Sequence, residues 1–370
     1  MLRKNLAFVL LFVFLSAQEE KTDGLKDFFA NSYPIGVALN GRQVKSDDVK
    51  TKRLIKDNFN SLSPENGLKW QLVHPEPDRY DFTFGDEYVA LGEEMGALTI
   101  GHCLVWHQQV PRWVFLDEKQ QLINKAALLA RMEEHIETVM GRYKGKIHGW
   151  DVVNEAFNED GSYRESEWYN IAGKDFIKTA FRKAQEVDPT AELYYNDFNV
   201  WKAEKRQGIL QLATEMVAEG LKVDAIGMQG HYQLETPSIE EIEQAILDIH
   251  EAGFKVVVTE LDVDVLPRPK QAEGADLNMN FANSDTYNPY KTGISTEGAA
   301  KLADRYAAIF RVFEKHNDKI SRVTFWGLHD GSSWLNHFPV RGRTNYPLLF
   351  DRNLDPKNDV IKKIKKVAKQ

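Results

Sequence analysis

Eight short runs of mostly apolar residues recur along the chain, and they limit its possible folds more than any other feature. Most are rich in Val, Ile, Leu and aromatic residues, which favour strands. The predicted strands cover residues 35–39, 60–66, 97–106, 147–155, 192–198, 225–231, 255–263 and 322–330. Longer segments with helical periodicity lie between them, so strands and helices alternate along the sequence.

The segment after the sixth run shows the helical pattern clearly. Ser238 and Glu241 form a predicted capping box, and the apolar residues from Ile242 onward recur on one helix face. Gly253 is the predicted stop of this helix. Residues 123–140 show the same periodicity.

This alternation predicts an α/β fold of one domain, a (β/α)8 TIM barrel. The 370 residues are enough for a barrel of about 250 residues with insertions. An open doubly wound sheet is the alternative, but no Gly-rich phosphate-binding loop follows any predicted strand. The longest irregular stretch, residues 264–294, is a predicted loop after strand 7, on the side where barrel loops build active sites.

The N-terminus has the features of a secretory signal peptide. Arg3 and Lys4 precede an apolar run over residues 6–15, and the small residues Ser16 and Ala17 follow it. We therefore expect a signal peptide over residues 1–17, a barrel domain over residues 18–370 and a secreted protein, periplasmic or extracellular. A short membrane anchor is the alternative.

Charge and cysteine content exclude several classes of partner and stabilisation. The net charge of -8 argues against nucleic acid or an anionic membrane surface as the partner. Because Cys103 is the only cysteine, no disulfide can form within the chain, and we expect it to be a buried small hydrophobic residue. We expect a monomer without stable membrane insertion.

Polar residues gather where the predicted strands end. In a barrel, the carboxyl ends of all the strands meet on one face. The residues concerned are Glu65, Asn66, His102, Trp106, Asn154, Glu155, Asn196, Asp197, Gln229, His231, Glu260, Asp262 and Trp326. So many converging polar ends are hard to explain by solvation alone and predict a functional site.

Two carboxylates stand out at these ends, Glu155 after the fourth strand and Glu260 near the end of the seventh. A carboxylate pair across a cleft suits glycoside hydrolysis. Retention of configuration needs a separation of about 5–5.5 Å and inversion about 6.5–9.5 Å. Aldolases and isomerases are competing barrel enzymes on this pattern alone.

Metal and cofactor chemistry has little support in the sequence. There is no H-E-x-x-H motif, nucleophile elbow or Walker loop, and a lone cysteine excludes cysteine-cluster zinc sites. His102 and His107 are five residues apart on a predicted strand, so they point to opposite sides. Residues 132–137 are expected to form a solvated helix face. We expect no metal and no cofactor.

The blocks at the strand ends, taken in order, resemble glycoside hydrolase family 10, the endo-β-1,4-xylanases. The likeness runs along nearly all of the chain after the signal peptide. Leu68 replaces the family's usual Met, and Cys103 stands where the family often has Thr. The blocks are "SPENGLKW", "GHCLVWHQQVPRW", "WDVVNEA", "YYNDFN", "GMQGHY", "VTELDV" and "TFWG" with "SSWL" and "LLFD".

The resemblance implies a role for each residue of the site. Glu155 would be the general acid/base and Glu260 the nucleophile, with Asn154, His231 and Asp262 in support. The implied substrate-binding residues are Glu65, Asn66, Lys69, His102, Trp106, Gln109, Tyr195, Gln229, Trp326 and Trp334.

Some of these residues have a purely structural alternative. Trp106 and Trp326 could belong to the core, Lys69 could be an ion-pair partner, and Tyr195 could be a core hydroxyl bonded to backbone. The loop after strand 7 would flank the leaving-group side of the cleft. There Tyr287 and Tyr290 would form a substrate contact or a lid, or the loop would be a surface flap.

Two further questions concern the substrate. Arg341 and Arg343 could meet an acidic substituent or offset nearby carboxylates. The implied function is a secreted endo-1,4-β-xylanase that hydrolyses xylan and xylo-oligosaccharides with retention. A non-catalytic carbohydrate-binding protein and a barrel acting on β-glucans or mannans are the alternatives.

Overall fold

The computed structural model describes residues 23–270, 272 and 281–369. The predicted signal peptide lies outside these residues, as does part of the loop over 264–294. Within the described part of the chain, no helix is both long and apolar enough to cross a bilayer.

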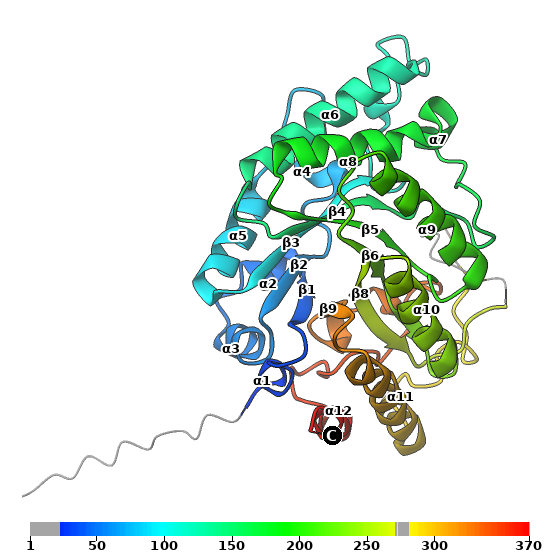
Figure 1. Ribbon diagram of the computed structural model, residues 1–370. Coiled ribbons are helices and arrows are strands. Elements are labelled where there is room, and N and C mark those ends of the chain that lie inside the picture. Colours follow the sequence, from blue (N-terminus) through cyan, green and yellow to red (C-terminus); the bar gives the residue numbers. More distant parts are fainter. Residues whose placement is uncertain (1–22, 271, 273–280, 370) are drawn as a thin grey trace, which may run out of the picture.

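Eight parallel strands close into a barrel, as predicted (Figure 1). Neighbours pair in chain order, and β9 closes the barrel by pairing with β1. The eight strands are β1 (Ile35–Leu39), β2 (Ser61–Pro64), β3 (Leu98–Trp106), β4 (Gly149–Asn154), β5 (Glu192–Asp197), β6 (Ala225–Met228), β8 (Lys255–Asp264) and β9 (Ile320–Phe325).

The run predicted as one strand over 225–231 is divided in two. Gly230 has a φ of 81°, a left-handed value that ends the extended backbone of β6. The short strand β7 (His231–Gln233) then pairs only with β8, beyond the end of β6. This break turns His231 toward the rim of the barrel beside β8.

Helices cover the outside of the barrel (Figure 1). The longer ones are α3 (Val49–Asn58), α5 (Thr83–Met95), α6 (Lys125–Arg142), α8 (Asp175–Val187), α9 (Ala203–Ala218), α10 (Ile239–Glu251), α11 (Thr296–Lys315) and α12 (Asn358–Val367). The short ones are α1 (Leu25–Phe28), α2 (Gly41–Val44), α4 (Trp70–Val73) and α7 (Glu167–Ala172). The predicted capping box opens α10, where Ser238 and Glu241 exchange hydrogen bonds.

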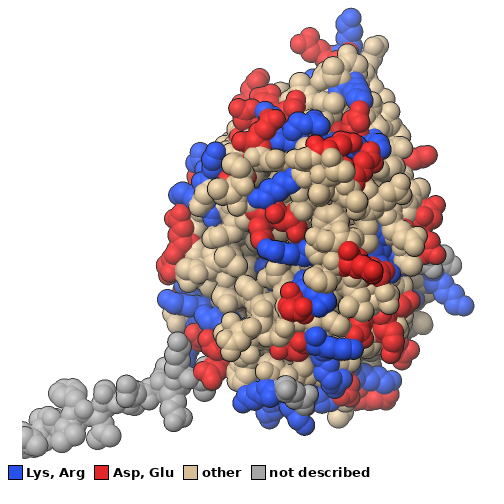
Figure 2. Space-filling model, viewed as in Figure 1, with Lys and Arg blue, Asp and Glu red and all other residues tan. Residues whose placement is uncertain are grey.

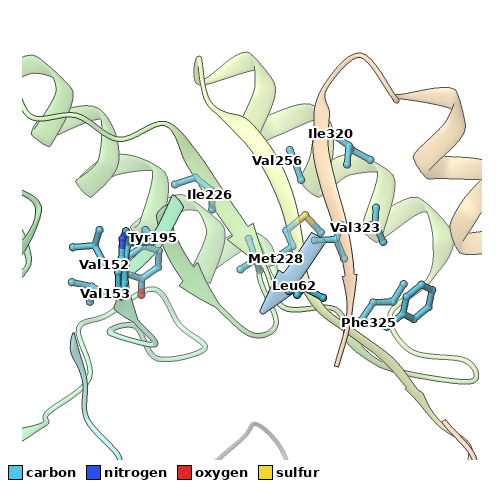
Figure 3. Close-up of a cluster of buried hydrophobic side chains, with 14 of the residues drawn as sticks. Leu62, Val152, Val153, Tyr195, Ile226, Met228, Val256, Ile320, Val323 and Phe325 are labelled. Atoms are coloured by element: carbon cyan, nitrogen blue, oxygen red, sulfur yellow. The ribbon is translucent and has the colours of Figure 1, made fainter. Parts of the chain in front are cut away.

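The core has two parts because each strand buries both faces. Inside the barrel, Ile100, Tyr194, Ala225 and Val257 form a small cluster. Between barrel and helices lies the main apolar layer, part of which Figure 3 shows. Cys103 is buried, as expected.

The expectation of a solvated helix face over residues 132–137 was wrong. Met132, His135 and Ile136 of α6 are buried, because this side of the helix packs on the barrel. The His135 ring stacks on Trp70 with 3.6 Å between ring centroids. Burial lowers the pKa of His135 well below its ordinary value, so this ring is neutral and structural.

Candidate active site

A pocket of about 180 Å³ opens at the carboxyl ends of the strands. Its walls contain thirteen of the fifteen predicted site residues, and the exceptions are Asp262 and Tyr195. The lining residues are Glu65, Asn66, Lys69, His102, Trp106, Gln109, Asn154, Glu155, Gln229, His231, Glu260, Trp326 and Trp334. Parallel register brings together side chains that are far apart in sequence.

Glu155 directly follows β4 and is held by neutral hydrogen-bond donors. The Trp106 indole N–H donates to Oε2 at 2.9 Å. The Gln229 and Asn154 amides donate to Oε1 at 2.9 and 3.2 Å. Among the described residues, the carboxyl group is therefore fixed without a cationic side chain in direct contact.

Glu260 on β8 is held differently, by an amide and a histidine. The Asn196 amide donates to Oε1 at 2.8 Å, and His231 Nε2 lies 3.1 Å from Oε2. Burial alone would raise the pKa of Glu260. The hydrogen bond from His231 and the electrostatic effects of His102, His231 and Lys69 outweigh burial and lower the pKa. Glu260 is therefore kept ionised.

His231 lies between two carboxylates. Its Nδ1 is 3.0 Å from Asp262, whose other oxygen accepts from the Trp334 indole at 2.8 Å. Burial would lower the pKa of His231, but Asp262 and Glu260 raise it to about 10. Asp262 thus supports His231 from behind, as expected, and the imidazolium donates to Glu260.

The wall on the β2 side is a series of hydrogen-bonded polar side chains that lies against the indoles of Trp106 and Trp326. Asn66 donates to Glu65 at 3.2 Å and accepts from the Lys69 ammonium at 3.0 Å. The Lys69 nitrogen is 4.6 Å from the ring centroid of Trp106. Burial raises the pKa of Glu65, with Lys69 opposing the rise. Lys69 therefore lines the pocket and binds Asn66 there, which favours the predicted binding role over a structural ion pair.

The two tryptophans with a core alternative belong to the pocket. Trp106 and Trp326 are 8% and 7% exposed, and this small exposed part faces the pocket. His102 stands edge-on to Trp326, with ring centroids 5.2 Å apart. Flat ring faces beside polar groups suit the alternating apolar and hydroxyl surfaces of a sugar.

Tyr195 does not reach the pocket, so its predicted contact with substrate was wrong. Alternation along β5 turns Tyr195 and Asp197 toward the helices and Tyr194 and Asn196 toward the barrel axis. The Tyr195 hydroxyl accepts from the Ala156 N–H at 2.8 Å and donates to Asp197 at 2.6 Å. The alternative, a core tyrosine whose hydroxyl is bonded to backbone, is confirmed, and the Asp197 carboxylate is a second partner of the hydroxyl.

Two residues that contact this machinery had no predicted role: Asn196 was noted only as a polar strand end, and Asp151 was not predicted at all. Asn196 donates to Glu260 and, at 2.9 Å, to Asn154, so it joins the two carboxylate assemblies. Asp151 on β4 binds His102 Nδ1 at 2.8 Å. Strand periodicity puts Tyr195 and Asn196 on opposite faces of β5 but does not show which of them faces the pocket. Asp151 lies below the strand end, where no sequence signal marks it.

Contacts decide the expectation for Arg343, and they place two tyrosines of the long loop. Arg343 is buried, lies 3.4 Å from Asp264 and donates to the backbone oxygens of Leu335 and Phe338, so it offsets an acidic group. Neither Tyr287 nor Tyr290 lines the pocket. Tyr290 packs against the main apolar layer instead.

Two further hollows continue the pocket into a groove. One shares Glu65 and Trp334 with the pocket and extends past Asn40 and Phe338. The other shares His231 and Trp334 and is lined by Phe198, Asn199, Trp201, Lys202, Gln233, Thr236, Pro237, Arg268 and Ala272. The carboxylates therefore lie at the middle of a cleft.

Acidic and basic side chains are interspersed over the face shown in Figure 2. Within the described ranges, no group of three or more His, Cys, Asp or Glu side chains is arranged to hold a metal ion.

Comparison with known proteins identifies the family. The model of glycosyl hydrolase family 10 matches residues 24–365. The chain belongs to this family. Endo-1,4-beta-xylanase A of Xylanibacter ruminicola is 43% identical over 362 residues, which are 98% of this chain and 97% of that protein.

Solved structures of xylanases share the fold. An endoxylanase from a sugarcane soil metagenome is 42% identical, with a TM-score of 0.89 over 94% of this chain and 100% of that one. An intracellular xylanase of Thermoanaerobacterium saccharolyticum, solved as a mutant with xylotriose, is 30% identical. Its TM-score is 0.80 over 94% of this chain and 99% of that one.

Proposed function

We propose that this family 10 hydrolase is an endo-1,4-β-xylanase that cleaves internal bonds of xylan with retention of configuration. The observation that carries the proposal is that two carboxylates in one pocket have different hydrogen-bond donors. Glu260 receives a hydrogen bond from a charged imidazolium, whereas the donors to Glu155 among the described residues are the neutral groups of Trp106, Gln229 and Asn154. An ionised nucleophile and a proton donor are the two roles that this reaction requires.

In the first step, the ionised Glu260 attacks the anomeric carbon of the sugar. The bond between that carbon and the glycosidic oxygen breaks, and Glu155 gives its proton to the departing oxygen. In the second step, Glu155 takes a proton from water, and the resulting hydroxide displaces Glu260. Each step inverts the anomeric centre, so the sum is retention.

The other lining residues suit binding of a linear polysaccharide. Asn154 is adjacent to Glu155 and can bond the 2-hydroxyl of the sugar under attack, an interaction that strengthens in the transition state. Glu65, Asn66, Lys69, His102, Gln109 and Gln229 offer hydrogen bonds beside the Trp106, Trp326 and Trp334 indoles. The hollows on both sides of the carboxylates support internal cleavage.

The first test is reducing-sugar release from arabinoxylan, carboxymethylcellulose and mannan by the wild type, Glu260→Ala and Glu155→Ala. We expect release from xylan and a loss of about 10³-fold or more in the Glu260 variant. Preferred release from the other polymers would favour a β-glucanase or mannanase. Binding of xylan without hydrolysis would favour a carbohydrate-binding protein. NMR of the first-formed anomer distinguishes retention from inversion.

We also propose export and a monomeric state, without nucleic acid or membrane as a partner. Export rests on the charged, apolar and small residues over positions 1–17. N-terminal sequencing of protein from culture fractions tests it, and a mature chain that still begins at Met1 in the cytoplasm would contradict it. Light scattering after size exclusion tests the monomer.

A further inference from the structure

The backbone at Glu155 has an unusual conformation. Its φ is 58°, in the left-handed region that residues other than glycine rarely adopt. Such a conformation persists only where the surrounding structure imposes it, and it is common at active sites. Whatever holds these peptide groups therefore also aims the carboxyl group of Glu155.

Hydrogen bonds fix the peptide groups on both sides of this residue. The Glu155 N–H donates to the backbone oxygen of Asn196 at 2.9 Å. Arg164 Nε donates to the backbone oxygen of Glu155, also at 2.9 Å. The next N–H, that of Ala156, donates to the Tyr195 hydroxyl at 2.8 Å. Tyr195 is thus the side-chain acceptor for the peptide that follows Glu155.

Tyr195 is itself fixed by a buried ion pair. Because the Ala156 N–H can only donate, Tyr195 must direct its own proton elsewhere, and Asp197 accepts it at 2.6 Å. Lys205 lies 2.8 Å from the other oxygen of Asp197. Both side chains of this ion pair are 0% exposed.

The protonation states of Tyr195 and Asp197 agree with the donor and acceptor assigned to the hydrogen bond between them. Burial and the neighbouring Asp197 raise the pKa of Tyr195 well above its ordinary value, so the hydroxyl keeps its proton. Burial raises the pKa of Asp197 to about 6, and the rise is opposed chiefly by Lys205. Lys205 therefore preserves the carboxylate that Tyr195 needs as an acceptor.

We propose that Tyr195, backed by the Asp197–Lys205 ion pair, is a positioning residue that holds the backbone of Glu155 in its productive conformation. The inference rests on the proposed acid/base role of Glu155. Tyr195 acts from outside the pocket: Figure 3 shows it beside Val152 and Val153, in the layer between barrel and helices. Its hydrogen bond to the Ala156 N–H is the contact through which it acts on Glu155.

The test compares two leaving groups in Tyr195→Phe, which keeps the ring and removes the hydroxyl. We expect kcat/KM for xylotetraose to fall on the order of 10–100-fold, because a misplaced acid protonates its leaving oxygen poorly. For 2,4-dinitrophenyl β-xylobioside, kcat/KM should stay within about twofold, because this leaving group departs without a proton. Equal losses on both substrates, or no loss on either, would overturn the proposal.

Tyr194→Phe is the matched control. Tyr194 is the neighbouring, equally buried tyrosine on β5, and its hydroxyl binds Glu192 away from Glu155. We expect it to leave both rates unchanged, and the same substrate-selective loss in this variant would overturn the proposal. If circular dichroism shows that Tyr195→Phe is unfolded, Asp197→Asn takes its place with the same expected selectivity.

Glu155→Gln in the same assays separates the two proposals. A selective loss in Glu155→Gln without one in Tyr195→Phe overturns the positioning role alone. If Glu155→Gln itself shows no selectivity for the leaving group, the acid/base assignment fails, and the inference fails with it.

Discussion

At the scale of single residues, His231 is the charged hydrogen-bond donor to Glu260. In His231→Gln the burial of Glu260 remains while its charged donor is lost, so the pKa of Glu260 rises. Because Glu260 must be ionised to attack, kcat/KM falls as pH drops through this pKa. We expect the acid limb of the kcat/KM profile to move up by on the order of 1–3 pH units.

The measurement is kcat/KM for the dinitrophenyl substrate across acidic pH, which avoids the need for proton donation. His148→Gln is the control, because His148 is exposed at the opposite end of β4 and bonds the Thr99 N–H. An unchanged acid limb in His231→Gln would show that the histidine does not set the ionisation of Glu260.

At the scale of elements, the capping box of α10 fixes where this helix begins. The Glu241 N–H donates to the Ser238 hydroxyl at 3.1 Å, and Glu241 accepts from the Ser238 N–H at 2.7 Å. Ser238→Ala leaves the first turn without this acceptor. We expect the free energy of unfolding, measured by urea titration, to fall by about 1 kcal/mol.

The control for the cap removes a hydroxyl from the middle of a helix. Thr214 of α9 is exposed, and Thr214→Ala improves helix propensity. A fall in stability that is equal in both variants would mean that the loss at Ser238 does not come from capping.

At the scale of the whole molecule, the groove extends on both sides of the carboxylates. Sugars bound in the outer hollows can contribute binding energy to the reacting centre. We expect kcat/KM to rise about tenfold or more from xylobiose to xylotetraose. Trp201→Ala, which removes an indole from one hollow, should flatten this rise; rates independent of chain length would contradict the extended groove.

The barrel and most of the site could be predicted because they depend on local patterns. Eight strand-like runs implied the closed sheet, and polar residues at their ends implied the pocket. The errors arose where tertiary register decides. Tyr195 and Asn196 are adjacent and both polar, and only the facing of β5 shows which one meets Glu260.

Two other features depend on contacts that no local pattern reports. His135 lies in a charged segment, yet it is buried because α6 turns that face toward Trp70. The left-handed backbone of Glu155 is held by partners from β5 and from the loop after β4. The apolar periodicity over residues 123–140 signalled a buried face that includes Met132 and Ile136, but nothing in a single sequence signals the backbone conformation of Glu155.

The solitary thiol of Cys103 makes the molecule suitable for fluorescence labelling at one chosen site. It is 2% exposed, and burial raises its pKa well above the ordinary value, so maleimide reagents should leave it unmodified. A cysteine introduced at exposed Arg42, on the wall of one hollow, would then be the only reactive thiol of the folded chain. A dye attached there would report the arrival of each polysaccharide chain in real time.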